Sequence, residues 1–335
     1  MKAKIGINGL GRIGRMVLRS IFEEKHRGLK IKHINNRADI KTACDLIKRD
    51  SIHGKFKGRV SVKKNNLIIN GNKITYSKET NLNNVSWKNY NVDIVFECTG
   101  KFNSKKKLIS HIKNGAKKVI VSAPCKNADK TIVYGINHSK ISNKDKIISA
   151  ASCTTNCLAP VVYVLHNNFE IEKGFMTTIH SYTTDQRMLD NSHKDPRRAR
   201  SANQSIVPTS TGASKAIGEI IPHLRGKLGG IAMRVPTPNV SLVEFVFHSK
   251  KNLSVESINL AFQKFSKNNK NNILGITHEK LVSIDFNHNP ASSIIDASLT
   301  NVVGNNMGKI SAWYDNEWGF SNRMCDIAEY LRKTF

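Results

Sequence analysis

The sequence predicts an α/β protein, in which a doubly wound parallel sheet is followed by a second, α+β domain with a mixed sheet. Strand-like and helix-like segments alternate over the first ~150 residues, which is typical of a parallel sheet with helical crossovers. Beyond Cys153 the pattern changes to longer strand-like runs with helices between them. A chain of 335 residues is long enough for about two domains.

The first domain is expected to open with a strand at residues 4–7, a short apolar run that leads into a glycine-rich turn. A helix over 12–24 follows, because Ile13, Val17 and Ile21 recur at helical spacing. The same reasoning predicts the remaining elements, which are strands over 30–34, 92–97 and 118–122 and helices over 40–48 and 105–113.

The second domain is expected to begin with a helix over 154–167, directly after Cys153. Apolar periodicity predicts both strands and helices in the rest of the chain. The strands are expected over 242–247, 281–286 and 309–313, and the helices over 214–221, 255–265 and 321–332.

Composition excludes several classes of protein. Hydrophobic residues make up 39% and charged residues 23% of the chain, as in ordinary globular proteins. No apolar run approaches the ~20 residues that span a bilayer, and the first residues lack the features of a signal peptide, so we expect a cytoplasmic protein. The six cysteines include no CxxC pair, so neither a disulfide framework nor a bound metal is expected.

The formal net charge of +28 is high and favours acidic partners such as nucleic acid, anionic lipid or phosphorylated small molecules. Lysine and asparagine are scattered through every segment, for example at residues 63–66 and 267–272, which is a pattern of solvated surface. No basic patch with interleaved aromatic residues occurs, so neither a specific nucleic-acid partner nor a membrane is expected. A basic nucleic-acid-binding or adhesion role is the alternative from another functional class.

A dinucleotide-binding motif lies near the start of the chain. Gly9, Gly11 and Gly14 fit GxGxxG, with Arg12 and Ile13 inside the motif. It follows a predicted strand and opens a predicted helix, which is the context of a Rossmann-type fold. The glycines permit the turn, the approach of a pyrophosphate and close helix packing, and the helix N-terminus would bind the phosphates. The alternative is an ordinary glycine turn.

The end of the second predicted strand indicates which dinucleotide is bound. Asn36 stands where an acidic residue would bind the ribose 2′-hydroxyl. Asn36 can hydrogen-bond a hydroxyl without repelling a 2′-phosphate, and Arg37 could pair with that phosphate. The sequence therefore favours NADP or NAD as the cofactor, with NADP accepted. The alternative for Arg37 is a solvated surface arginine.

Cys153 is the candidate nucleophile. It stands where a predicted strand meets a predicted helix, and a helix N-terminus lowers the pKa of a cysteine and favours the reactive thiolate. Cys157 lies one helical turn later and is either a second reactive thiol or, more in keeping with its type, a buried packing residue. His180 ends an apolar run and could act as a base, although pattern alone does not distinguish it among twelve histidines.

These segments resemble the phosphorylating glyceraldehyde-3-phosphate dehydrogenases. The stretch Ala-Ser-Cys-Thr-Thr-Asn-Cys around Cys153 is far more specific than GxGxxG, and the matches span nearly the whole chain in family order. They are residues 6–15, 152–160, 180–183, 208–213, 234–241 and 314–319.

The resemblance implies a reaction. Cys153 would attack the aldehyde of glyceraldehyde 3-phosphate, with His180 as base and the backbone N–H of Cys153 in the oxyanion hole. Hydride transfer would leave a thioester, which inorganic phosphate would convert into 1,3-bisphosphoglycerate. Two anion sites are implied, and physical reasoning agrees with hydroxyl, backbone N–H and guanidinium donors there. The substrate phosphate would meet Thr183 and Arg234, with Asp185 as an orienting group, and the attacking phosphate Ser152, Thr154, Thr211 and Gly212; Arg198 is the further anion contact.

The resemblance also implies an architecture and further cofactor contacts. The dinucleotide-binding domain would cover 1–152 and the catalytic domain 153–315, with a C-terminal helix over 316–335 returning to the first domain. The protein would be a homotetramer, in which the loop over about 181–203 lines the neighbouring subunit's cofactor site. Besides the glycine motif, the cofactor contacts would be Asn36, Arg37, Thr99, Gly100, Ser122, Ser192 and Asn316, the last of them at the nicotinamide carboxamide.

The chain departs from the family pattern where the cofactor is chosen. Asn36 replaces the usual ribose-binding Asp, and Asn191-Ser192 replaces a Leu-Pro pair; Ser at the second position is typical of members that accept NADP. Ala150 and Phe320 also depart from the usual residues. The runner-up is erythrose-4-phosphate dehydrogenase, because residues 285–290 resemble that branch of the family. Residues 209–212 and 237–239 favour the triose phosphate branch instead.

Overall fold

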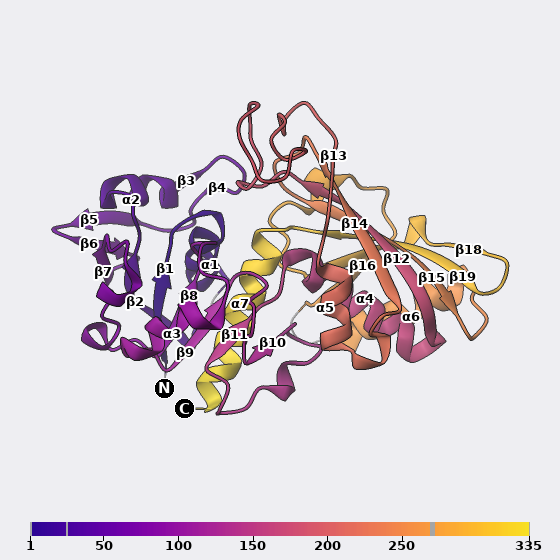
Figure 1. Ribbon diagram of the computed structural model, residues 1–335, viewed down its shortest axis with the longest axis horizontal. Coiled ribbons are helices and arrows are strands. Elements are labelled where there is room, and N and C mark those ends of the chain that lie inside the picture. The colour runs from indigo at the N-terminus through magenta and orange to yellow at the C-terminus, as the bar shows by residue number, and fades with distance from the viewer. Residues whose placement is uncertain (1, 25, 269–271, 335) are drawn as a thin grey trace. The chain divides into compact units, whose positions relative to one another are not determined.

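The computed structural model describes residues 2–24, 26–268 and 272–334 (Figure 1). The chain forms two compact units, which we call unit 1 (Met1–Ser152 with Ser321–Phe335) and unit 2 (Cys153–Phe320). Part of the Lys/Asn run at 267–272 and the expected end of the last helix at 335 lie outside the described residues.

Unit 1 is built on a sheet that has nine strands within the described residues. Neighbouring strands from β10 to β7 pair in parallel, and β6 and β5 extend the sheet in antiparallel pairing. In spatial order they are β10 (Lys130–Thr131), β11 (Ile147–Ser149), β9 (Lys118–Val121), β8 (Ile94–Glu97), β1 (Ala3–Asn8), β2 (Leu29–Asn35), β7 (Asn72–Ser77), β6 (Asn66–Ile69) and β5 (Val60–Lys63).

The central strand β1 explains why this sheet is the core of unit 1. Its residues Ile5 and Ile7 are fully buried, as expected for a parallel strand with helices on both faces. The helices of unit 1 are α1 (Arg12–Glu23), α2 (Ile40–Lys48), α3 (Lys105–Lys113) and α7 (Trp318–Leu331) from Ser321 onward, and β3 (Arg49–Asp50) pairs with β4 (Gly54–Lys55). The C-terminal helix is fixed to α1 by a hydrogen bond of 2.8 Å from Ser20 Oγ to Asn322 Oδ1.

Unit 2 contains a mixed sheet, with β12 parallel to β14 on one side and antiparallel to β15 on the other. Its strands are, in spatial order, β13 (Val207–Thr209), β14 (Leu228–Val235), β12 (Ile171–Ser181), β15 (Ser241–Ser249), β19 (Met307–Tyr314), β17 (Ser293–Asp296) and β16 (Leu274–Thr277), with β18 (Asn301–Val303) beside β19. The helices α4 (Cys153–Phe169), α5 (Ala213–Ile220) and α6 (Val255–Asn268) belong to this unit. Burial alternates along β15, so one face of the sheet meets the helices.

The predicted fold class is confirmed, and the predicted helices 40–48 and 105–113 have the bounds of α2 and α3. The strand expected over 281–286 is wrong, because residues Ser283–Phe286 form a 3-10 helix. Asp285 accepts a hydrogen bond of 2.8 Å from the Val282 N–H, and such a local bond from a short acidic side chain favours a turn over a strand.

The strands β5 to β7 were not predicted from the sequence. All three are short, and β6 and β7 are joined by a two-residue loop, Asn70-Gly71, in which both residues have positive φ values of 48° and 78°. This is the geometry of a tight hairpin, and asparagine followed by glycine is the usual sequence for it. Of the helices in the described part of the chain, none has the length and apolar character needed to cross a bilayer.

Candidate active site

Cys153 is the first residue of α4 and is half-buried. Its Sγ lies 3.5 Å from Nε2 of His180, the penultimate residue of β12. Arg234, near the end of the neighbouring strand β14, places Nη1 2.6 Å from the other ring nitrogen of His180. The two strands run in parallel with His180 opposite Arg234, so the sheet brings thiol, imidazole and guanidinium together.

The charge states of these groups differ from the expectation for a cysteine at a helix N-terminus. Burial raises the pKa of the Cys153 thiol, and Arg234 and the Thr154 N–H and hydroxyl only partly offset this. Burial and then the charge of Arg234 lower the pKa of His180 to about 3. The expected lowering of the thiol pKa is therefore wrong for this structure, because desolvation outweighs the helix dipole, and the pair is a neutral thiol beside a neutral imidazole.

The tautomer of His180 depends on which partner holds Nδ1. The Ser181 carbonyl oxygen and Arg234 Nη1 each lie 2.6 Å from Nδ1. A guanidinium can only donate, so its bond to Nδ1 leaves the ring proton on Nε2, facing the sulfur. A bond from Nδ1–H to the carbonyl leaves Nε2 free to accept the thiol proton.

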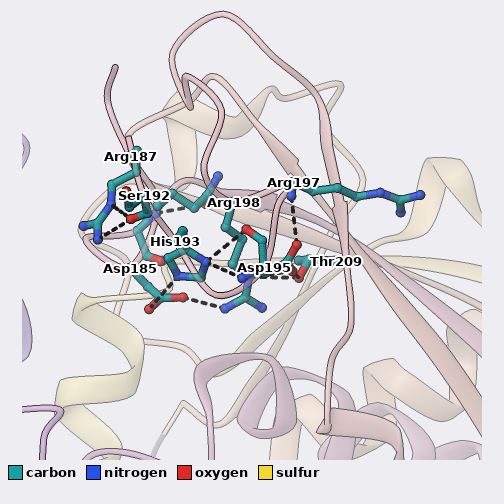
Figure 2. A network of polar contacts seen from close by, with 10 residues as sticks. Asp185, Arg187, Ser192, His193, Asp195, Arg197, Arg198 and Thr209 are labelled. Atoms are coloured by element: carbon teal, nitrogen blue, oxygen red, sulfur yellow. Dashed lines mark hydrogen bonds and ion pairs between the residues drawn. The ribbon is translucent and has the colours of Figure 1, made fainter. Parts of the chain in front are cut away.

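A cluster of polar contacts lies on the segment between β12 and β13 (Figure 2). Asp185 Oδ2 accepts a bond of 2.5 Å from Arg198 Nη1, and Arg198 Nε donates to Thr209 Oγ1 at 2.9 Å. His193 Nε2 lies 3.7 Å from the other oxygen of Asp185. The pKa of Arg234 is lowered, first by burial and also by the charge of Arg198, so these two guanidinium groups are close enough to repel each other.

The three arginines of the segment 197–200 have different partners. Arg197 points away from the Asp185–Arg198 pair in Figure 2, and Arg200 Nε pairs with Asp190 Oδ2 at 2.8 Å. Arg198 is thus the one held toward Asp185. The Nε of Arg234 is buried and has no hydrogen-bond partner among the described residues. Such an unsatisfied cationic donor near a second guanidinium favours an anion as partner.

The other predicted phosphate contacts have defined positions. Thr183 is half-buried, and its N–H donates to Gln186 Oε1 at 3.3 Å. Thr211 Oγ1 accepts from the Ala213 N–H at 3.2 Å, and Gly212 is the exposed N-cap of α5. The Thr154 hydroxyl, which was expected to hold the attacking phosphate, lies 2.9 Å from the phenol oxygen of Tyr314 in the interior of unit 2.

Four further residues that were singled out from the sequence lie at separate positions. Ser152, the last residue of the first segment of unit 1, is half-buried. Ser192 is exposed, and its carbonyl oxygen accepts both Nε and Nη2 of Arg187 at 3.0 and 2.9 Å. Asn316 Oδ1 accepts from Ser241 Oγ at 3.2 Å. Cys157 is fully buried with Sγ 3.6 Å from Ser293 Oγ, so it is a packing residue.

A cavity of about 490 Å³ in unit 1 follows the carboxyl ends of β1, β2 and β8. Gly9 and Gly11 line it together with Asn36, Arg37 and Thr99. Gly9 has a positive φ of 92°, which a tight turn requires. In an open parallel sheet, ligands bind at this edge, and the N-terminus of α1 offers N–H groups to an anion.

The remaining residues of the glycine motif lie behind the cavity wall. A Cβ on Gly14 would stand 1.9 Å from the Gly9 carbonyl oxygen, so the predicted close packing of helix and strand is present. Arg12 is bonded at 2.5 and 3.0 Å to both oxygens of the buried Asp50. The guanidinium of Arg12 is therefore held at Asp50 by two of its five N–H donors.

Asn36 and Arg37 differ in how they are held. Asn36 Oδ1 accepts from the Leu10 N–H and its Nδ2 donates to the Tyr76 hydroxyl, both at 3.0 Å. Arg37 is exposed at the cavity and forms no ion pair with the described residues. Glu79 also lines the cavity. The 2′ end of a dinucleotide would thus meet one fixed amide, one available guanidinium and one carboxylate.

Two residues that line this cavity, Asn8 and Thr99, are held by a buried polar network that sequence reasoning missed. We call this network the floor of the cavity. Glu97 accepts from Asn8 Nδ2 at 2.7 Å, from the Thr99 N–H at 2.8 Å and from the Thr99 hydroxyl. His111 Nε2 lies 3.0 Å from the same carboxylate, and Trp87 Nε1 donates to His111 Nδ1 at 2.9 Å.

Gly100 and Ser122 complete the set of expected cofactor contacts. Gly100 has a positive φ of 70° directly after Thr99, and the Ser122 N–H donates to the Glu97 carbonyl at 3.0 Å. Neither residue lines the cavity. Within the described ranges, no cluster of three or more His, Cys, Asp or Glu side chains could hold a metal ion.

Comparisons with known proteins agree over the full length of the chain. The glyceraldehyde 3-phosphate dehydrogenase NAD binding domain matches residues 3–105, and the C-terminal domain of the same family matches residues 152–316. A glyceraldehyde-3-phosphate dehydrogenase of Zymomonas mobilis is 47% identical over 100% of both chains. The chain belongs to the glyceraldehyde 3-phosphate dehydrogenase family. Enzymes of that name from Geobacillus stearothermophilus, 48% identical over 99% of this chain and 98% of the relative, and Cupriavidus necator (plasmid), 50% over 99% of each, agree.

Family membership confirms the resemblance inferred from the heptapeptide around Cys153. The match of residues 3–105 to an NAD binding domain supports a nicotinamide cofactor for unit 1. Three buried residues of the two sites, Glu97, Asp50 and Tyr314, carried no local sequence signal. Each has a partner far away in the chain, which is Asn8 for Glu97, Arg12 for Asp50 and Thr154 for Tyr314.

Proposed function

We propose that the protein oxidises glyceraldehyde 3-phosphate to 1,3-bisphosphoglycerate with a nicotinamide dinucleotide and inorganic phosphate. The observation that carries this proposal is the pairing of Cys153 Sγ with His180 Nε2 at 3.5 Å beside two guanidinium groups. A thiol with an adjacent base suits covalent catalysis on an aldehyde, and two neighbouring cations suit a phosphorylated substrate.

The first half of the reaction makes a thioester on Cys153. The sulfur bonds to the aldehyde carbon while His180 Nε2 accepts the thiol proton and returns a proton to the carbonyl oxygen, which gives a thiohemiacetal. His180 then takes the hydroxyl proton as hydride leaves the same carbon. A bound nicotinamide dinucleotide supplies the acceptor for that hydride. The lowered pKa of His180, about 3, keeps its ring unprotonated near neutral pH, so the ring has a lone pair that can accept a proton.

The second half returns Cys153 to its starting form. A phosphate oxygen bonds to the thioester carbon, the carbon–sulfur bond breaks, and the thiolate takes up the proton that His180 accepted in the first half. Arg234, whose charge lowers the pKa of Cys153, stabilises the sulfur as it leaves. The two anion sites are assigned to Thr183, Asp185, Arg198 and Arg234 for the substrate phosphate and to Ser152, Thr154, Thr211 and Gly212 for the attacking phosphate.

The bound substrate would also set the tautomer of His180. Arg234 competes for Nδ1 with the Ser181 carbonyl, each at 2.6 Å. When the guanidinium turns to a phosphate, Nδ1–H can donate to the carbonyl, and Nε2 becomes the acceptor that base catalysis needs. The base is thereby available when an anionic substrate is present.

Assays with two aldehydes test the proposal. Reduced dinucleotide should form from glyceraldehyde 3-phosphate only when inorganic phosphate is present, and Cys153→Ser should lower the rate by at least ~10³-fold because the thiolate is lost. Erythrose 4-phosphate should be the poorer substrate. If the enzyme ignores phosphate and prefers the four-carbon sugar, the assignment is wrong.

We also propose that the enzyme accepts NADP as well as NAD. The absence of a carboxylate at Asn36 and the exposed Arg37 support this, since a guanidinium pairs well with a 2′-phosphate. Arg12, Ile13, Thr99, Gly100, Ser122, Ser192 and Asn316 are the other proposed cofactor contacts. Glu79 at the same cavity opposes a 2′-phosphate, so dual use is expected rather than exclusive use of NADP.

The ratio of kcat/KM for NADP to that for NAD tests the choice of cofactor. Arg37→Ala should lower this ratio by roughly tenfold, the value of one charge-assisted hydrogen bond, and Asn36→Asp should lower it by at least as much through repulsion. Glu79→Gln is the matched control and should raise the ratio. If wild-type enzyme used NAD hundreds of times more efficiently, the proposal would fail.

Finally, we propose a homotetramer. The segment between β12 and β13 exposes Met188, Leu189 and Ile206, and exposed apolar side chains grouped on one segment favour a protein partner. Light scattering of the purified protein measures the mass of the assembly directly. A monomeric mass at assay concentration would rule out the tetramer.

A further inference from the structure

Unit 1 contains a second cavity, at the opposite edge of its sheet from the cavity described above. It encloses about 460 Å³, close to the 490 Å³ of the first cavity. Its wall includes Lys2, just before β1, the first three residues of β2 (29–31) and Asn72, the first residue of β7. These are the amino ends of three neighbouring parallel strands, whereas the first cavity lies at carboxyl ends. The two cavities can therefore be occupied independently.

The charged side chains in the wall of this second cavity are all basic. Lys2, Arg27 and Lys30 are exposed, and none of the three forms an ion pair with another described residue. His26 is half-buried in the same wall. No described Asp or Glu side chain lines the cavity, not even that of Glu24, two residues before His26. Unpaired cations that face one cavity favour an anionic ligand.

Two carboxylates close to the second cavity already have cations of their own. Glu329 accepts from the Gly28 N–H at 2.8 Å and pairs with Arg332 at 2.6 Å. Glu23, the last residue of α1, pairs with Arg19 at 3.0 Å. The carbonyl groups at the end of a helix act as about half a negative charge, which is small beside three unpaired cations. The cavity therefore favours an anion with more than one charge.

The rest of the wall is mostly apolar. Ile21 of α1 and Leu29 and Ile31 of β2 are buried, and Phe22 is half-buried. Phe22 packs edge-on against Phe56, with ring centroids 6.3 Å apart, and this contact fixes its ring in the wall. A cavity of a few hundred Å³ that combines apolar side chains with a few convergent charged groups is the usual form of a small-molecule site.

The positive charge of the chain is unevenly distributed between the two units. Most of the excess of Lys and Arg over Asp and Glu lies in unit 1. Such a field raises the local concentration of any anion, but it does not select one. The apolar part of the wall selects, because it stabilises an anion that carries an apolar group and gives nothing to an inorganic anion.

We propose that the second cavity is a further nucleotide site, which binds a nucleoside polyphosphate with its phosphates on Lys2, Arg27 and Lys30 and its base against the apolar wall. Several unpaired cations suit a polyphosphate better than a single carboxylate, and the flat face of a base suits aliphatic and aromatic side chains. The site lies at the other edge of the sheet from the dinucleotide cavity and takes no part in the proposed oxidation. It is therefore independent of which aldehyde is oxidised.

The test is protection of Lys30 from acetylation by a soluble N-hydroxysuccinimide ester, with the modified peptide quantified by mass spectrometry. GTP is the probe, because guanine differs from the adenine of the dinucleotide expected in the first cavity. Acetylation of Lys30, which is exposed, should slow as GTP is added. Lys73 is the internal reference. It is exposed and follows Asn72 in β7, where successive side chains alternate between faces, so its acetylation should keep a constant rate in the same sample.

Two variants and a second ligand separate the parts of the site. Arg27→Gln should raise the GTP concentration that half-protects Lys30 by about tenfold, the value of one charge-assisted hydrogen bond. Arg49→Gln is the matched control, because it removes the same charge from an exposed position of unit 1 that lines neither cavity, and its midpoint should equal that of wild type. Tripolyphosphate lacks the base and should protect Lys30 roughly tenfold more weakly, because it leaves the apolar wall in water.

A constant rate of Lys30 acetylation in GTP overturns the proposal, as does a wild-type midpoint in Arg27→Gln. Equal midpoints in Arg27→Gln and Arg49→Gln would assign the protection to the general charge of unit 1 and also overturn it. If tripolyphosphate protects as well as GTP, the cavity does not recognise a nucleotide. Both arginines are exposed, and unfolding temperatures equal to that of wild type confirm that the variants differ only at the altered side chain.

Discussion

The polar floors of the two sites are built on different principles. Under the cavity of unit 1, the carboxylate of Glu97 collects donors from Asn8, Thr99 and His111. Under Cys153 in unit 2, Tyr314 joins two neutral threonine hydroxyls. A carboxylate can only accept, so the direction of every bond in the first network is fixed. Hydroxyls can donate and accept, so the second network can reverse.

This difference matches what each site has to do. A dinucleotide pocket needs its walls in one place throughout the reaction, and a fixed acceptor holds them there. The sulfur of Cys153 would change between thiol, thioester and thiolate, and a network of neutral hydroxyls adds no fixed charge to its surroundings. A buried carboxylate next to the sulfur would raise the pKa of the thiol further, in addition to the effect of burial. Three sets of measurements test this difference between the two units.

The largest effect is expected from acid, through one buried neutral histidine in each unit. The pKa of His180 is lowered to about 3 by burial and Arg234, and that of His33 in unit 1 to about 4 by burial. As the pH falls, these histidines become protonated near pH 6.5 in the unfolded chain but only at a lower pH in the folded chain. Their contribution to stability is therefore complete above that pH and is lost as the pH falls through the window down to each folded pKa.

Urea unfolding at a series of pH values measures this loss. Between about pH 6.5 and pH 4, the wild type should lose about 3 kcal/mol of unfolding free energy relative to His180→Asn. Relative to His33→Asn the loss should level off near pH 4, whereas for His180 it should continue toward pH 3. Parallel curves for wild type and both variants would show that neither ring is kept neutral by the fold.

Glu97→Gln should have the next largest effect, because an amide replaces one accepting oxygen by a donor. At least one of the buried donors from Asn8, Thr99 or His111 then loses its partner, at a cost of about 2 kcal/mol. Affinity for the dinucleotide should fall as well, measured by titration calorimetry. Glu79→Gln, an exposed carboxylate at the same cavity, should leave stability unchanged. Equal stability of the two variants would contradict the proposed fixed floor.

Local patterns predicted the parts of these sites that are local. The glycine motif, the helices at 40–48 and 105–113 and a helix start next to Cys153, predicted at residue 154, depend on neighbours a few residues apart, and the sequence shows them. Glu97 and Tyr314 do not. Tyr314 meets Thr154 across 160 residues of chain, and only the pairing of β19 into the sheet of unit 2 brings them together.

Charge states were the other part that the sequence could not supply. A helix N-terminus predicts a low pKa for Cys153, yet burial raises it, and burial is a property of packing. His180 became a candidate base only through the family resemblance, because its partners Cys153 and Arg234 come from α4 and β14. The strand expected at 281–286 failed for a related reason, since the Asp285 side chain bonds its own backbone.

The smallest effect is expected from substitutions in the glycine turn of the unit 1 cavity, which test the turn separately from the Glu97 network. A Cβ on Gly14 would lie 1.9 Å from the Gly9 carbonyl oxygen, whereas a Cβ on Gly11 would come no closer than 3.9 Å to Cys98. Gly14→Ala should therefore cost about 1.5 kcal/mol of stability through overpacking against backbone and should weaken dinucleotide binding. Gly11→Ala should leave stability unchanged and weaken binding alone, because its methyl group occupies space that the pyrophosphate needs. If Gly11→Ala binds the dinucleotide as tightly as wild type, the backbone at Gly11 is not the phosphate contact. Binding would then depend on the residues held by Glu97 rather than on the glycine turn.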